Sequence, residues 1–90
     1  MKVLTTPRFN RAVKKLHLQE KHLLDEAVRF ICSNPEAGEL KKGDLTGVRV
    51  HKYKFNTEQM LLAYLANTQE QVIILLGYGS HENFYRALKH

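Results

Sequence analysis

The chain has little of several residue types that carry structure or chemistry. It has one cysteine, Cys32, and no tryptophan among its 90 residues. A lone cysteine excludes a disulfide framework within the chain and any metal site built from several cysteines. Cys32 falls in an apolar helical pattern, which favours a small core residue over a nucleophile. One unpaired thiol is typical of a reducing compartment, so we expect a cytoplasmic protein.

Long hydrophobic runs are also missing. The longest, residues 60–66 and 72–76, are far shorter than the ~20 residues that span a bilayer. No secretory signal is visible, because Met1 to Thr5 leads directly into polar sequence. We therefore expect a soluble protein with no membrane partner.

Acidic residues are few relative to basic ones. Nine acidic against fourteen basic residues give a net charge of +5 and a pI of about 9.5. This balance favours an anionic partner, either nucleic acid or an acidic protein. The sequence shows no repeats or linkers, and we expect one domain over residues 1–90.

Two helices are expected in the first third of the chain. Thr6 and Pro7 form a helix start, with a capping side chain followed by proline at the first helical position. Residues 17–20 interrupt the apolar spacing and predict a connection between helices. A second helix is expected over residues 21–32 and ends at Ser33-Asn34-Pro35.

The remaining segments predict a sheet. Four have strand-like composition: residues 2–5, 48–55, 60–66 and 72–76. Short turns join the last three into an antiparallel meander. Residues 36–47 are rich in glycine and predict a loop with Leu40 and Leu45 turned inward. The expected fold class is α+β, in the order β-α-α-β-β-β, with the helix pair packed on a mainly antiparallel, twisted sheet.

The end of the chain is expected to leave the sheet. Gly77-Tyr78-Gly79 predicts a turn, and Ser80 is the expected N-cap of a short final helix. On that helix His81 and Tyr85 are four residues apart and share a face. An imidazole and a phenol on one face are suited to proton transfer. The other interpretation is a structural helix that carries both by chance.

The strand at residues 48–55 mixes basic and apolar side chains on both faces. Strict alternation separates His51 from Lys52 and Lys54. A bulge between Val50 and Tyr53 would place His51 with one of these lysines on one face, where they could bind phosphate and shuttle a proton. The alternative is an exposed edge strand protected by its lysines.

Metal-free RNA cleavage suits these residues. Histidines can supply the acid and the base, cations can stabilise the phosphate charge, and an aromatic ring can hold an unstacked base. No metal site is expected, since His51 and His81 lack the spacing of zinc ligands. No glycine-rich phosphate loop is present, and no cofactor is expected.

Four stretches resemble the RelE/ParE superfamily of type II toxin–antitoxin toxins. They are residues 40–47, 48–55, 61–64 and 76–89. The final Gly-x-His-x-x-Phe/Tyr stretch is similar to that of the YafQ-type ribosome-dependent mRNA interferases. The resemblance implies a RelE-like fold, a catalytic His81 and an assisting aromatic, Phe84 or Tyr85.

The chain matches RelE toxins at some positions and departs from them at two. Lys52 and Lys54 match the lysines of the family, and Tyr85 matches its C-terminal tyrosine. The arginine that RelE toxins carry near Leu61 or Leu62 is absent, and His81 stands where their later arginine lies. The ParE branch shares the fold but inhibits DNA gyrase.

The resemblance implies a toxin that cleaves mRNA on the ribosome and so inhibits translation and growth. The alternatives are a ParE-like gyrase inhibitor and a non-catalytic antitoxin-binding homologue. The expected catalytic residues are His81, Tyr85, His51, Lys52 and Lys54. The expected RNA contacts are Arg49, Lys41, Lys42, Phe84, Arg86 and Lys89. The implied partners are a cognate antitoxin, mRNA with ribosomal RNA, and operator DNA reached through the antitoxin.

Overall fold

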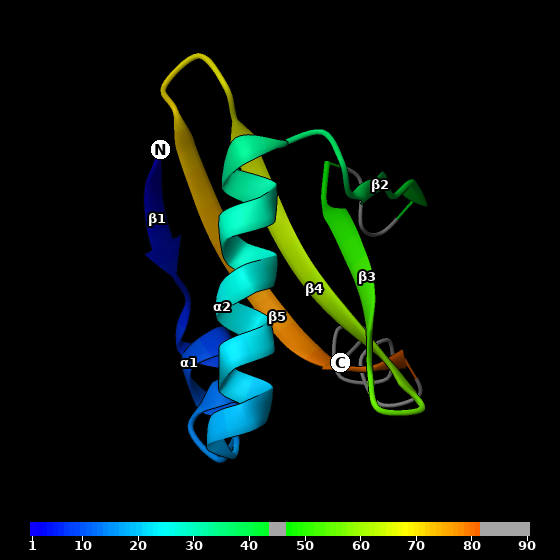
Figure 1. The fold of residues 1–90 in the computed structure, drawn as a ribbon. Coiled ribbons are helices and arrows are strands. Elements are labelled where there is room, and N and C mark those ends of the chain that lie inside the picture. Colours follow the sequence, from blue (N-terminus) through cyan, green and yellow to red (C-terminus); the bar gives the residue numbers. More distant parts are fainter. Residues whose placement is uncertain (44–46, 82–90) are drawn as a thin grey trace.

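A computed structural model describes residues 1–43 and 47–81 (Figure 1). In chain order its elements are β1 (Lys2–Thr5), α1 (Pro7–Val13), α2 (Leu18–Ser33), β2 (Glu39–Leu40), β3 (Arg49–Phe55), β4 (Glu58–Asn67) and β5 (Val72–Ser80). The expected C-terminal helix and the expected inward position of Leu45 lie outside the described residues. The α+β class and the order of the helices and long strands are as the sequence predicts.

The five strands form one mixed sheet in the order β1-β5-β4-β3-β2. β3, β4 and β5 are the predicted antiparallel meander, and β1 joins its far side parallel to β5. Helix α2 crosses one face of this sheet, and α1 lies beside β5 (Figure 1). The helix pair therefore covers one face, as predicted.

The first helix begins where the sequence predicts. The Thr6 hydroxyl accepts a hydrogen bond from the Phe9 backbone N–H at 3.2 Å and lies 3.1 Å from the Leu75 carbonyl oxygen, to which it donates. Thr6 therefore caps α1 and also ties its start to β5.

The second helix begins three residues earlier than predicted. His17 is extended at the N-cap position, and its carbonyl accepts the Lys21 N–H at 2.9 Å. The first turn was missed because Leu18 is 77% exposed and does not extend the buried apolar stripe. At the other end, the backbone and side-chain amides of Asn34 both donate to the Phe30 carbonyl and close the helix.

The predicted loop at residues 36–47 contains the short strand β2. Glu39 pairs with Val50, and Leu40 pairs with Arg49. The expectation that Leu40 turns inward is wrong, since 51% of it is exposed. β2 is the outermost strand of the sheet, so Leu40 has less protein around it than a residue on a central strand.

The predicted turn at residues 77–79 is wrong, because β5 continues through them to Ser80. β4 runs alongside and pairs Ala63 with Gly77 and Met60 with Ser80. The register shifts by one residue between Ala63 and Tyr64, which is the signature of a β-bulge. The shift places Tyr78 on the same face as Leu75, so Tyr78 joins the core beneath the helices.

The core lies on both faces of the sheet. The larger cluster packs between helices and sheet and includes Phe9, Ile31, Leu62, Tyr64 and Ile73. Cys32 is half-buried against this cluster, which fits its predicted packing role. A smaller buried cluster of Val50, Leu61 and Ala63 lies on the opposite face. Both faces of the central strands are therefore buried.

Candidate functional site

β3 carries four of the candidate residues, Arg49, His51, Lys52 and Lys54, and it has no bulge in its pairing with β4. Its pairing with β4 runs without interruption from Arg49 opposite Tyr64 to Phe55 opposite Glu58. The bulge that would have joined His51 with a lysine is absent from this pairing, and His51 lies on the opposite face from Lys52. Beyond Val50, the described residues pair with β3 on its β4 side only. Within the described residues, the part of β3 from His51 to Phe55 is thus a sheet edge. This agrees with the alternative interpretation, an edge strand that carries lysines.

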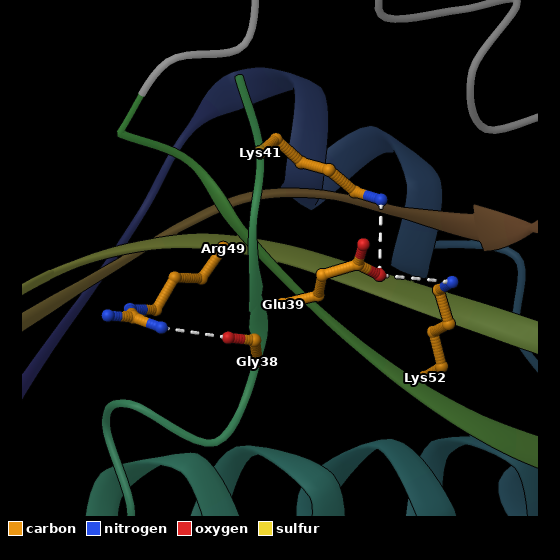
Figure 2. A network of polar contacts seen from close by, with 5 residues as sticks. All are labelled: Gly38, Glu39, Lys41, Arg49 and Lys52. Atoms are coloured by element: carbon orange, nitrogen blue, oxygen red, sulfur yellow. Dashed lines mark hydrogen bonds and ion pairs between the residues drawn. The ribbon is translucent and has the colours of Figure 1, made fainter.

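Two of the candidate cations meet at one carboxylate (Figure 2). Oε2 of Glu39 lies 3.3 Å from Nζ of Lys41 and 3.3 Å from Nζ of Lys52. Hydrogen bonds from Lys52 and Lys41, with the attraction of their charges, lower the pKa of Glu39. We call these three side chains the Glu39 cluster. It lies on the face of β3 away from α2, since Lys52 alternates with His51.

Arg49 has a different position and different contacts. Its guanidinium donates to the carbonyl of Gly38 at 2.9 Å and to that of Glu36 at 3.2 Å. Figure 2 shows it pointing away from the two lysine ammonium groups. The structure does not bring Arg49 together with Lys41 and Lys52, and its hydrogen bonds hold the segment that leads into β2.

Tyr64, a buried residue of β4, also holds the segment that leads into β2. Its hydroxyl donates to the Pro35 carbonyl at 2.8 Å and accepts the Gly38 N–H at 2.9 Å. Burial raises the pKa of Tyr64, which keeps the hydroxyl protonated as a donor. The approach is so close that a Cβ on Gly38 would lie 2.7 Å from the hydroxyl oxygen. The start of β2, and with it Glu39, is therefore fixed from the core.

His51 belongs to a row of rings beneath α2. Its ring centroid lies 5.1 Å from that of Phe30 and 5.9 Å from that of Tyr53. The ring of Tyr53 in turn stacks on that of Tyr78, with their centroids 6.4 Å apart. The Tyr78 hydroxyl donates to Oε2 of Glu20 at 2.6 Å and links β5 to α2. Burial lowers the pKa of His51, so the imidazole is neutral near pH 7.

An open hollow lies beside this row, between α2 and the free edge of β3. Its lining residues are Leu23, Glu26, Ala27, Phe30, His51, Tyr53 and Lys54. Lys54 alternates onto the Glu39 face but also borders this hollow. Lys54 therefore borders the hollow from a strand position on the face that carries Lys52.

His81 directly follows β5 and is exposed. The pairing of β5 with β4 ends at Ser80, opposite Met60, and His81 is already helical. In the sheet, β4 lies between β5, which His81 follows, and β3, which carries Lys52 and Lys54.

The other candidates divide between exposed and undescribed positions. Lys42 is exposed next to the Glu39 cluster. Tyr85, Phe84, Arg86 and Lys89 lie outside the described residues, so their roles stay predictions. The residue that the sequence interpretation missed is Glu39. Glu39 lies on β2 and Lys41 directly follows it, two residues on, so recognition of β2 would have pointed to the pair.

Within residues 1–43 and 47–81, no group of three histidine, cysteine or acidic side chains is placed to hold a metal ion. No helix in the same residues is long and apolar enough to cross a membrane.

Comparison with known proteins identifies the family. A family model described as a ParE-like toxin of the type II bacterial toxin–antitoxin system matches residues 3–89. The chain belongs to this family. It is thus a toxin of a type II toxin–antitoxin system, in the RelE/ParE superfamily. No curated protein sequence matches the chain.

Solved structures with the same fold include toxin–antitoxin complexes. The chain is similar to a chain of the intact RelBE complex of Escherichia coli, at 15% identity and a TM-score of 0.68 over 87% of this chain and 93% of that one. A chain of the RelBE2 complex of Mycobacterium tuberculosis has 18% identity and a TM-score of 0.68, with 89% and 96% covered. A conserved hypothetical protein of Helicobacter pylori has 26% identity and a TM-score of 0.60, with 91% and 96% covered.

Proposed function

We propose that this toxin is a metal-independent endoribonuclease that cleaves mRNA on the ribosome and so inhibits translation. The observation that carries the proposal is the convergence of Lys41 and Lys52 on the exposed Glu39 carboxylate, with Lys54 alternating onto the same face of β3. Such a face attracts RNA phosphates, and the net charge of +5 strengthens the attraction.

The chemistry assigns a role to each group. A base removes the proton of the ribose 2′-hydroxyl, whose oxygen bonds to phosphorus, and an acid protonates the departing 5′-oxygen. Lys52 and Lys54 stabilise the added negative charge on the phosphate. His81, which directly follows β5, transfers a proton, and Tyr85 assists it, as the family resemblance implies.

His51 has no part in the transfer that we propose. It is stacked between Phe30 and Tyr53 on the face beneath α2, opposite Lys52. Its neutral ring borders the hollow but does not face the Glu39 cluster. We therefore assign proton transfer to His81 and structural packing to His51.

The proposed partners follow from the family. The RelBE structures are toxin–antitoxin complexes, and we propose a cognate antitoxin for this chain. An acidic antitoxin segment would complement the basic surface, and the antitoxin would connect the toxin to operator DNA. The ribosome would present the mRNA and add ribosomal RNA contacts.

A second candidate function is inhibition of DNA gyrase. The description of the matching family as ParE-like favours it, as does the separation of His51 from the lysines. Under this alternative the basic face would block an enzyme and would cleave nothing.

Induced expression in a bacterial host separates the two. We expect growth arrest with new 5′ ends inside translated messages and normal plasmid supercoiling. Arrest with intact messages and lost negative supercoiling would instead support gyrase inhibition. A well-folded protein that causes no arrest would indicate a non-catalytic homologue.

A further inference from the structure

The Glu39 cluster has the geometry of an occupied anion site. Two ammonium groups, one from Lys41 just after β2 and one from Lys52 on β3, each lie 3.3 Å from the same carboxylate oxygen. A phosphate oxygen between two lysines would make the same pair of contacts, because each ammonium group acts as a compact point charge. A phosphodiester carries the same single negative charge as the carboxylate.

The carboxylate is reachable and replaceable. The Glu39 side chain is 59% exposed, whereas that of Lys41 is 19% exposed and that of Lys52 is 36% exposed. The lysines are thus the better-packed part of the cluster, and the carboxylate is the solvent-facing part. Exposed ion pairs contribute little to stability, so an incoming anion loses little by displacing this one.

We propose that the Glu39 carboxylate occupies, in the free toxin, the position that one RNA phosphate takes between Lys41 and Lys52. Glu39 is then an internal competitor that weakens RNA binding. The inference rests on the proposed function only in the choice of RNA as the anion.

Lys41 and Lys52 keep Glu39 ionised near neutral pH, and the ionised form is the one that competes with a phosphate. Their hydrogen bonds and charges lower its pKa, so the carboxylate remains ionised there. Release therefore requires displacement by another anion, and a modest fall in pH does not provide it. The position of β2 is fixed by Tyr64 and Arg49, so the carboxylate stays beside the lysines.

The test measures binding without cleavage. The probe is a fluorescein-labelled single-stranded RNA of about ten nucleotides with 2′-O-methyl riboses, which have no 2′-hydroxyl to attack the phosphate. Wild type is compared with Glu39→Gln and with Glu70→Gln, a matched control. Glu70 is exposed in the turn between β4 and β5, so its loss changes the net charge equally but away from the cluster.

We expect Glu39→Gln to bind about fivefold more tightly than Glu70→Gln at low salt, the effect of one charge about 4 Å away in water. Its salt dependence should steepen by about 0.7 in log–log slope, because in the other proteins the displaced Glu39 carboxylate offsets about one of the counterions that the single strand releases. Lys52→Ala in the Glu39→Gln background should remove this gain. Equal binding by the two glutamine variants, or no RNA binding by any protein, overturns the inference.

A second measurement keeps the test independent of variant folding. Inorganic phosphate added to wild-type toxin should shift the carboxylate carbon resonance of Glu39 and leave that of Glu70 unchanged. Equal shifts at both would contradict the site. RNA binding that obeys these expectations without any cleavage would refute the nuclease proposal alone, and cleavage without a Glu39 effect would refute this inference alone.

Discussion

The Gly38 backbone N–H donates a 2.9 Å hydrogen bond to the hydroxyl of Tyr64, a fully buried side chain on the central strand β4. The same hydroxyl donates to the Pro35 carbonyl at 2.8 Å. These two bonds fix the backbone immediately before Glu39. The core thus positions the exposed strand that carries the Glu39 cluster.

Tyr64→Phe should lower the free energy of unfolding by about 1–3 kcal/mol, because it leaves the buried Gly38 N–H without its acceptor. Urea denaturation measures this change. Tyr53→Phe is the control, since within the described residues its buried hydroxyl makes no hydrogen bond of good geometry and has only a weak interaction with the Tyr78 hydroxyl. We expect a change near zero for the control, and equal losses in both variants would argue against the role given to Tyr64.

His51 should make the protein less stable in mild acid. Burial lowers its pKa in the folded state, so the unfolded chain binds the proton more readily. Stability should therefore fall as the pH drops below the usual histidine pKa of about 6.5. Unfolding compared at about pH 7.5 and about pH 5.5 should show a smaller difference in His51→Phe than in wild type. His22→Gln is the control, because His22 is exposed. This variant should keep the part of the pH-dependent stability difference that His51 contributes.

Replacing a lysine of β3 should slow RNA cleavage more than the loss of one positive charge elsewhere on the surface. Lys52→Ala and Lys54→Ala should each weaken transition-state stabilisation by about 1–3 kcal/mol, roughly 5- to 150-fold in rate, by analogy with hydrogen bonds to charged groups. Single-turnover cleavage on programmed ribosomes measures the rate. Lys15→Ala removes the same charge from an exposed position just after α1. Equal losses of cleavage rate in all three variants would show that only the net charge of the protein matters.

The helices and the meander could be predicted because their signals are local. The Thr6-Pro7 start and the two apolar strands each carry their own pattern in the sequence. β2 could not be predicted, because two residues carry no periodicity and their pairing depends on contacts with β3. The length of β5 was underestimated because Gly77 and Gly79 are typical of turns, whereas their pairing with β4 keeps them in the sheet.

The candidate site was predicted in part. The composition of β3 identified Lys52 and Lys54, and the family resemblance identified His81. Whether His51 joined them depended on a bulge, which the sequence allowed but the register with β4 excludes. The contacts of Arg49 with Gly38, and of Glu39 with the lysines, join strands through tertiary packing, which composition does not reveal.

The most direct test of the central claim is mRNA cleavage by purified toxin on programmed ribosomes, with 5′ ends mapped for wild type, His81→Ala and His51→Gln. The account predicts site-specific cleavage by wild type, its loss in folded His81→Ala, and most of it retained in folded His51→Gln. Full cleavage by His81→Ala together with its loss in His51→Gln would contradict the assigned roles. No cleavage by folded wild-type toxin would contradict the nuclease function itself.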